Sequence, residues 1–239
     1  MHTSFAQKVS RGFTLLELLI VIAILAILAA VVIIVLNPAQ TLAQARDAQR
    51  LSDLSTLKSA LSLYMTTVNP VDLDTDAATC FGDVVTNALI SYSSTNADPG
   101  ACATVLTPGA GADASGDFAV DSCRSTTSSS LVGGTGWVPV NFNNITGGTP
   151  LSNLPLDPTN TALDTTPTVA DYMYRYICQQ GTVDGTKPTP AFELAAVLES
   201  TKYAGASPNQ DLDANDGGDN TAYYEIGTTL TIGPTEATY

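Results

Sequence analysis

The chain has 239 residues, with 9 Lys and Arg against 23 Asp and Glu, and a formal net charge of −14. A surface this acidic repels phosphate backbones, which argues against direct binding of nucleic acid. The only histidine is His2, and the chain has no GxxxxGK[ST], HExxH or GxSxG motif, so we expect no enzymatic activity. The length accommodates an apolar anchor plus one globular domain.

The N-terminus divides into a polar leader and a long apolar run. Residues 1–12 are cationic and lack the apolar core that a general secretory signal places before its cleavage site. Among the 24 residues from Phe13 to Leu36, only Glu17 is charged. A helix of that length spans about 36 Å, enough to cross a hydrocarbon core of about 30 Å. Because the leader is basic, we expect it on the cytoplasmic side and the rest of the chain after Leu36 outside.

The junction between leader and apolar run reads Gly12-Phe13-Thr14-Leu15-Leu16-Glu17. In this setting the motif resembles the processing site of type IV pilins and type II secretion pseudopilins. The resemblance implies that a membrane prepilin peptidase cuts between Gly12 and Phe13. It also implies that the new N-terminal Phe13 is N-methylated and that Glu17 acts in filament assembly.

The residues themselves point to the same chemistry. Cleavage after the small Gly12 leaves a cationic amine on Phe13, four residues before Glu17. A carboxylate in lipid needs a positive partner, and the amine of an adjacent subunit can supply it. Such a pair would set the axial register between neighbours. The alternative is a plain membrane anchor in which Glu17 is incidental.

Beyond the apolar run the pattern changes. Asn37-Pro38 predicts a kink or local melting, because proline removes a helix hydrogen bond. Apolar residues then recur at helical spacing until Asn69-Pro70, which predicts an amphipathic helix over residues 37–69. Its apolar face is expected to pack under a sheet, with charged residues such as Asp47 and Arg50 on the other faces.

Residues 70–136 are expected to form a variable, loop-rich insert, dominated by Asp, Ala, Gly, Ser and Thr. Two short apolar pieces, 84–92 and 118–120, indicate a helix and a strand. In the pilin family this region between helix and sheet is the variable one, and no function for it can be assigned from its residues.

The four cysteines, Cys80, Cys102, Cys123 and Cys178, lie far apart and lack the CxxC spacing of zinc or redox motifs. An even number beyond a membrane segment fits disulfides in an oxidising compartment. Three pairings can be drawn. We favour Cys80–Cys102, since both lie in one loop-rich region, which leaves Cys123–Cys178. Buried free thiols are the alternative.

Residues 137–239 carry the clearest strand patterns. Segments 172–178 and 192–199 alternate apolar and polar residues around a loop rich in Gly, Asp and Pro, which predicts an antiparallel hairpin. Further strands are expected at 137–142, 223–226 and 230–232. The order of these motifs resembles the sheet region of secretion pseudopilins. We therefore expect an α+β, pilin-like fold, with a long N-terminal α-helix packed on a small antiparallel sheet.

A loop near the C-terminus is rich in oxygen ligands. Asp211, Asp213, Asn215 and Asp216 present carboxylates and an amide, the groups that Ca²⁺ prefers. The segment is not an EF-hand, because no ligating Glu follows at the required distance. Pseudopilins carry a calcium loop after the sheet, and this resemblance favours Ca²⁺ here. A solvated turn is the alternative, and 72–76 is a second candidate site.

Together, these features and the resemblance predict a structural subunit that is processed after Gly12, extracted from the membrane and stacked by its helix into a filament. The expected partners are identical or related subunits, the prepilin peptidase, the inner-membrane assembly platform and the membrane before assembly. We expect a single-pass membrane protein first and an extracellular or periplasmic filament afterwards. Surface pilus, secretion pseudopilus and competence filament all remain open. Two other classes do too: a membrane-anchored binding module with residues 13–36 as a tether, and a hydrolase using paired carboxylates.

Overall fold

The structure is a computed structural model. It describes residues 12–75, 80, 89–93, 119–124, 130–161, 171–180, 190–205 and 211–233. The chain divides into two compact units, Met1–Leu42 and Ala43–Tyr239. Most of the expected leader, residues 1–11, lies outside the described residues.

The first unit consists mainly of helix α1, Leu15–Leu36. Its side chains are exposed along its described length. The helix ends at Asn37, whose backbone is left-handed with φ 39°. Helix α2, Pro38–Thr67, starts at the next residue, and a proline at the first helical position needs no hydrogen-bond partner for its nitrogen. The predicted interruption at Asn37-Pro38 is therefore confirmed.

Asn37 serves both helix ends at this break. Its left-handed conformation stops α1, and asparagine tolerates that conformation better than most residues. Its side-chain Oδ1 accepts a hydrogen bond from the backbone N–H of Gln40 (3.4 Å), and its carbonyl accepts one from Thr41 N–H (3.2 Å). The same residue thus ends one helix and caps the next.

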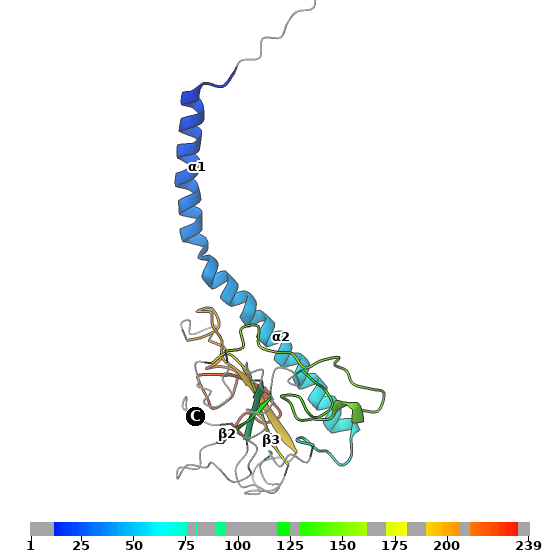
Figure 1. Cartoon of the computed structure of the whole chain (residues 1–239). Helices are drawn as coiled ribbons and strands as arrows, with labels where there is room; N and C mark the ends of the chain where they lie inside the picture. The colour runs from blue at the N-terminus through cyan, green and yellow to red at the C-terminus, as the bar shows by residue number, and fades with distance from the viewer. Residues whose placement is uncertain are drawn as a thin grey trace, which may run out of the picture. The chain divides into compact units, whose positions relative to one another are not determined.

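The second unit packs α2, from Ala43 onward, on a five-stranded sheet (Figure 1). The strands are β1 Leu89–Ser93, β2 Ala119–Arg124, β3 Tyr174–Gln179, β4 Ala191–Ala196 and β5 Tyr224–Gly227, in the order β2-β1-β3-β4-β5. Strands β1, β3, β4 and β5 pair antiparallel, which agrees with the expected antiparallel sheet, whereas β2 pairs parallel with β1. A parallel pair needs a long connection, and the 25 residues between β1 and β2 in the sequence are long enough for one.

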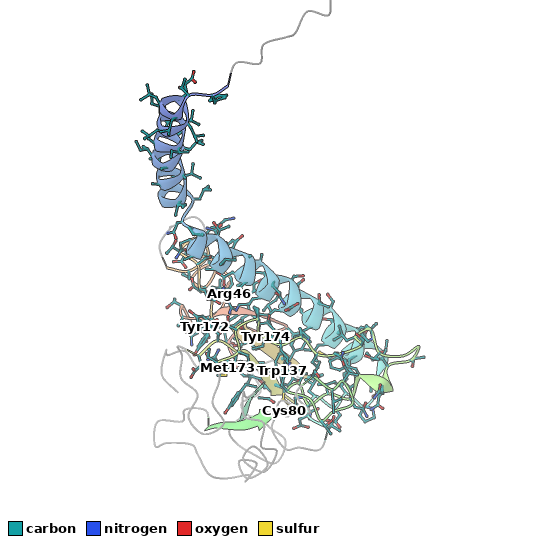
Figure 2. All side chains as sticks on the ribbon, turned by 45° about the horizontal axis from the view of Figure 1, so that its top comes forward. Arg46, Cys80, Trp137, Tyr172, Met173 and Tyr174 are labelled. Atoms are coloured by element: carbon teal, nitrogen blue, oxygen red, sulfur yellow. A yellow bond between two sulfur atoms is a disulfide. The ribbon has the colours of Figure 1, made fainter. Side chains whose placement is uncertain are left out.

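The core lies between α2 and one face of the sheet. Leu54, Leu57, Leu61 and Tyr64 recur every three or four residues, so they share one side of α2, and all are buried. Alternate residues of the two central strands meet them: Tyr174, Tyr176 and Cys178 of β3, and Phe192, Leu194 and Ala196 of β4. Figure 2 labels Trp137 and Tyr174 in this layer, where their rings lie 5.9 Å apart.

Two strand predictions are wrong. Residues 137–140 form no strand, and residues 142–144 form a short 3₁₀ helix, η1 (Phe142–Asn144). Pro139 has no N–H to offer a ladder, and Trp137 is fixed instead by its indole N–H, which donates to the Pro155 carbonyl (2.8 Å). Residues 230–232 also form no strand. There the backbone N–H of Ile232 donates to a Glu193 carboxylate rather than to a neighbouring strand (3.0 Å).

In the insert, residues 89–93 form strand β1 where the segment 84–92 predicted a helix, and 84–88 lie outside the described residues. The strand expected around 118–120 is confirmed as β2, with residue 118 outside the described part. Strands β3 and β4 confirm the central hairpin.

Candidate functional site

The start of α1 is closed by a reciprocal pair of hydrogen bonds. Thr14 is the N-cap residue, and its Oγ accepts from the backbone N–H of Glu17 (3.2 Å). Glu17 reaches back, and its Oε2 accepts from the Thr14 backbone N–H (2.9 Å) and from the Thr14 hydroxyl (2.8 Å). This is a capping box, which satisfies donors that a helix start otherwise leaves unpaired. It directs the Glu17 carboxylate toward the N-terminal end of the helix.

Thr14 was not among the predicted site residues, although it is the N-cap of α1. The signal was available as Thr-x-x-Glu before an apolar run, the usual pattern of a capping box. The pattern gives Glu17 a local function in its own helix, in addition to any function between subunits.

The predicted cleavage bond lies just before this cap. Gly12 and Phe13 are not helical, both are exposed, and Phe13 is 82% exposed. Within the described part of the chain, no atom outside its immediate neighbours lies within 4 Å of the position that a Cβ on Gly12 would occupy. As far as the described residues show, the bond between Gly12 and Phe13 is therefore sterically open and lies ahead of the first helix.

Helix α1 is apolar and unburied. The stretch Leu15–Ile33 has a mean hydropathy of 3.2 and none of it is buried. Within the described residues it is the one helix long and apolar enough to cross a membrane. All described side chains of α1 are exposed, so the rest of the described chain does not bury this helix. Its apolar surface therefore needs lipid or other protein chains around it.

In the second unit, a buried ionic cluster fixes α2 to the loops around the sheet. Asp47 and Arg50 are fully buried on α2. Arg50 donates from Nε to Asp157 Oδ2 (2.7 Å), from Nη2 to Asp157 Oδ1 (2.8 Å) and from Nη1 to Asp47 Oδ1 (2.9 Å), and it pairs with Glu199 (2.5 Å). Asp47 in turn accepts from the backbone N–H groups of Glu199 (2.9 Å) and Ser200 (2.8 Å).

The expectation that Asp47 and Arg50 lie on faces other than the apolar one is wrong, because both are fully buried and continue the spacing of Leu54 and Leu57. Burial alone would raise the pKa of Glu199, but hydrogen bonds from Arg46 and Arg50 lower it to about 2. Arg46 is labelled on α2 in Figure 2 and pairs with the same carboxylate. Glu199 therefore stays ionised at neutral pH, and its ion pairs with Arg46 and Arg50 anchor α2.

One disulfide links the insert to the sheet. Cys80 bonds to Cys178 on β3, and both are buried in the core. The favoured pairing Cys80–Cys102 is therefore wrong. The reason is that the residue 80 end of the insert packs back against β3, as the hydrogen bond from Cys80 N–H to Asp74 (3.0 Å) and the Gln180 contacts with residues 73–74 indicate. Cys102 and the Cys123 side chain lie outside the described residues.

The acidic loop brings two of its four candidate ligands together. The side chains of Asp211 and Asp213 lie within hydrogen-bonding reach of each other. Burial and the neighbouring Asp211 raise the pKa of Asp213 to about 7. Asp213 is nearly buried, and its Oδ1 has no hydrogen-bond partner. The Asn215 amide donates to the Asp211 carbonyl (2.7 Å).

Asp216 faces elsewhere. Its carboxylate accepts from the backbone N–H groups of Gly218 (2.8 Å) and Glu225 (2.5 Å), which closes a turn before β5. No group of three or more His, Cys, Asp or Glu side chains in the described part of the chain is arranged to hold a metal ion. Of the four predicted ligands, the structure brings Asp211 and Asp213 together and engages Asp216 in the turn before β5.

Comparison with known proteins locates the family signal at the N-terminus. A family model described as the prokaryotic N-terminal methylation motif matches residues 7–33, which include the capping box and most of α1. Comparison with curated proteins and with solved structures gives no match.

Proposed function

We propose that this chain, which carries the N-terminal methylation motif of the type IV pilin and type II secretion pseudopilin family, is a structural subunit of a pilus-like or pseudopilus filament. The observation that carries the proposal is that the methylation motif lies on an apolar helix with no buried residues in its membrane-length stretch. Glu17 of this helix is turned toward its N-terminal end, where processing would create the amine of Phe13. Pilins are typically structural proteins without enzymatic activity, and we infer the same for this chain.

Processing would begin at the bond between Gly12 and Phe13. A peptidase needs an accessible, non-helical substrate, and the exposure of both residues ahead of the Thr14 cap supports this step. Cleavage removes residues 1–12 with their two basic side chains. The remaining side chains, 7 basic and 23 acidic, give a formal charge of −16. N-methylation of Phe13 keeps the amine cationic, so it can still pair with a carboxylate.

Assembly would then join Glu17 of one subunit to the amine of Phe13 in its neighbour. A carboxylate held in an apolar layer is strongly stabilised by a cationic partner. The capping box supports this because it already holds the carboxylate at the amino end of α1. In the filament the α1 surfaces would cover one another, so the run that crosses the membrane before assembly becomes the filament interior.

Intact-mass and N-terminal analysis of the protein purified from cells tests the proposal. We expect the mass to lack residues 1–12 and to carry one methyl group on Phe13. An untouched leader, or cleavage near Ala30, would contradict it. A chain that is processed but never found in a filament would favour the alternative, a membrane-anchored binding module with α1 as its tether.

We also propose that Asp211 and Asp213, with Asn215, bind Ca²⁺. The support is the adjacent carboxylates and the unpartnered Oδ1 of Asp213, since a hard cation would satisfy that oxygen. Asp216, already engaged by two backbone N–H groups, is not required.

Thermal unfolding with and without added CaCl₂ tests the cation site. A ligand that binds only the folded state raises the unfolding temperature, so we expect a Ca²⁺-dependent rise in the unaltered chain that is lost in Asp213→Asn. The same protein in MgCl₂ is the matched control and should show a smaller rise. An equal response to Ca²⁺ in Asp213→Asn would contradict this site.

A further inference from the structure

Two glutamates are buried on the sheet face that points away from α2. Glu193 lies on β4 between Phe192 and Leu194, which point into the core, so its side chain emerges on the opposite face. Glu225 lies on β5 and pairs in register with Ala195, two residues along β4 from Glu193. The two glutamates are thus diagonal neighbours on one face, and they are 1% and 3% exposed.

The side chains of Glu193 and Glu225 lie within hydrogen-bonding reach of each other, so a single proton can join the two carboxyl groups. Each also accepts from backbone N–H groups of the C-terminal part of the chain. Glu193 Oε2 accepts from Ile232 and Gly233 (both 3.0 Å), and Glu225 Oε2 accepts from Asn220 (3.1 Å).

The backbone around the pair approaches too closely for side chains. A Cβ on Gly218 would collide with the Glu225 carboxylate, and a Cβ on Gly233 would collide with that of Glu193. Residues 218–233, which we call the latched segment, therefore close directly over the carboxyl pair. They include β5, which is an edge strand and pairs only with β4 in the described sheet.

The charged surroundings oppose ionisation of both groups. Burial raises the pKa of Glu193, and the nearby Asp219 raises it further. Burial and the charge of Glu193 raise the pKa of Glu225 to about 9, with Asp216 adding to the shift. On the same face, β3 contributes Arg175, whose guanidinium lies over the Tyr223 ring at 4.5 Å.

We propose that the Glu193–Glu225 pair is a proton-dependent latch, which holds residues 218–233 against β4 while one proton is shared and releases them when both carboxyls ionise. With the proton in place, the pair makes one hydrogen bond and carries a single charge. Without it, two anions would lie side by side out of water, a state of high free energy. Lifting the latched segment rehydrates both carboxylates and removes that cost.

The direction of the pH dependence follows. Both folded-state pKa values are raised above those of the unfolded chain, so the pair contributes its full stabilisation at low pH. That contribution falls as pH rises and is lost once pH exceeds the folded value for Glu225, about 9. Release is therefore expected on the alkaline side of neutrality.

Hydrogen exchange followed by mass spectrometry on the full processed chain in detergent tests the latch. Protection factors, corrected for the intrinsic pH dependence of exchange, are compared at pH 7 and pH 10 for peptides covering 228–233. We expect protection to fall about a hundredfold in the unaltered chain, because lifting the segment releases one proton, so its opening equilibrium shifts about tenfold per pH unit from pH 7 up to the folded pKa of Glu225, about 9. Peptides from β3 should keep their protection and serve as the internal control.

Two single substitutions supply the matched variants. Glu225→Gln and Glu193→Gln each leave one carboxylate beside a neutral amide that can still hydrogen-bond, so protection in 228–233 should no longer depend on pH in this range. An unchanged protection factor in the unaltered chain would overturn the proposal, and this measurement needs no variant to fold. An equal alkaline loss in both glutamine variants would overturn it as well.

Discussion

Arg50 links three acidic residues from three separate parts of the second unit. It contacts Asp47 one turn away on α2, and Asp157 and Glu199 from loops more than a hundred residues later. All of Arg50's side chain is out of water, so its guanidinium depends on these carboxylates and on the Thr159 hydroxyl for the hydrogen bonds that water would otherwise make.

Replacing Arg50 with Met should strongly destabilise the second unit. The substitution keeps most of the side-chain volume but leaves Asp47 and Asp157 as buried carboxylates without their cation, which typically costs about 3–5 kcal/mol. Denaturant unfolding of the processed chain, followed by fluorescence of the single tryptophan, Trp137, measures the loss.

Lys58→Met on the same helix is the control. Lys58 is only half-buried, and substitutions of this kind usually change the free energy of unfolding by about 0.5 kcal/mol or less. Equal losses for the two variants would show that the Arg50 cluster does not anchor the helix.

The N-terminal residues and the Arg50 cluster differ in how far they can be predicted from the sequence. The roles of Gly12, Phe13 and Glu17 can be predicted from the sequence, because their chemistry depends only on spacing within six residues. The partners of Arg50 are not, because an Asp or Glu far along the chain carries no local sign that it will meet a particular helix residue. A charged helix position is usually solvated, and that general rule failed here for Asp47 and Arg50.

At the scale of elements, the disulfide closes a loop of 98 residues in sequence between the insert and β3. Cross-linking so long a loop restricts the unfolded chain strongly, so we expect Cys80→Ser with Cys178→Ser to lose about 2–5 kcal/mol of unfolding free energy. Non-reducing peptide mapping should recover a peptide joining Cys80 to Cys178. A peptide joining Cys80 to Cys102 would contradict the structure.

The packing of α2 on the sheet gives a second prediction at this scale. Leu57 is fully buried between helix and sheet, whereas Leu63 on the same helix is 41% exposed. Leu57→Ala should cost about 2–5 kcal/mol because it leaves a cavity. Leu63→Ala should cost about 0.5 kcal/mol or less. Similar losses in denaturant unfolding would mean that α2 does not cover the sheet through this face.

Elements with a strong repeating pattern could be predicted, and elements stabilised by side chains could not. The helix spacing of α2 and the alternation in β3 and β4 follow from one buried face each. Residues 137–142 and 230–232 also contain apolar residues in a strand-like order. However, Trp137 donates its indole N–H to a loop carbonyl, and the backbone N–H of Ile232 donates to a side chain, so neither segment pairs with a neighbouring strand. The carboxyl pair of Glu193 and Glu225 could not be foreseen either, because it needs the register of β4 on β5.

At the scale of the molecule, the two units place opposite demands on their surroundings. The first exposes an apolar helix that water does not tolerate, and the second has its own buried core, a disulfide and a strongly acidic composition. Under the proposed function, a single chain satisfies both demands by residing first in a membrane and then in a filament whose interior is built from α1. Glu17 is then the one charge that must find a partner inside that apolar layer.

Because of the capping box, the charge of Glu17 can be removed without removing its hydrogen bond to Thr14. Glutamine at position 17 can still accept from the Thr14 backbone, because Gln serves as well as Glu in a capping box. Glu17→Gln therefore keeps the helix start and removes only the charge. Thr14→Ser, which retains both the hydroxyl and the charge, is the matched control.

The most direct measurement is the amount of filament sheared from cells that express each variant at equal levels in the membrane. We predict that Thr14→Ser assembles as the unaltered chain does, while Glu17→Gln is processed and retained in the membrane but yields few or no filaments. Normal filaments from Glu17→Gln would contradict the account, because subunits would then be joined without a pair between this carboxylate and the neighbouring amine.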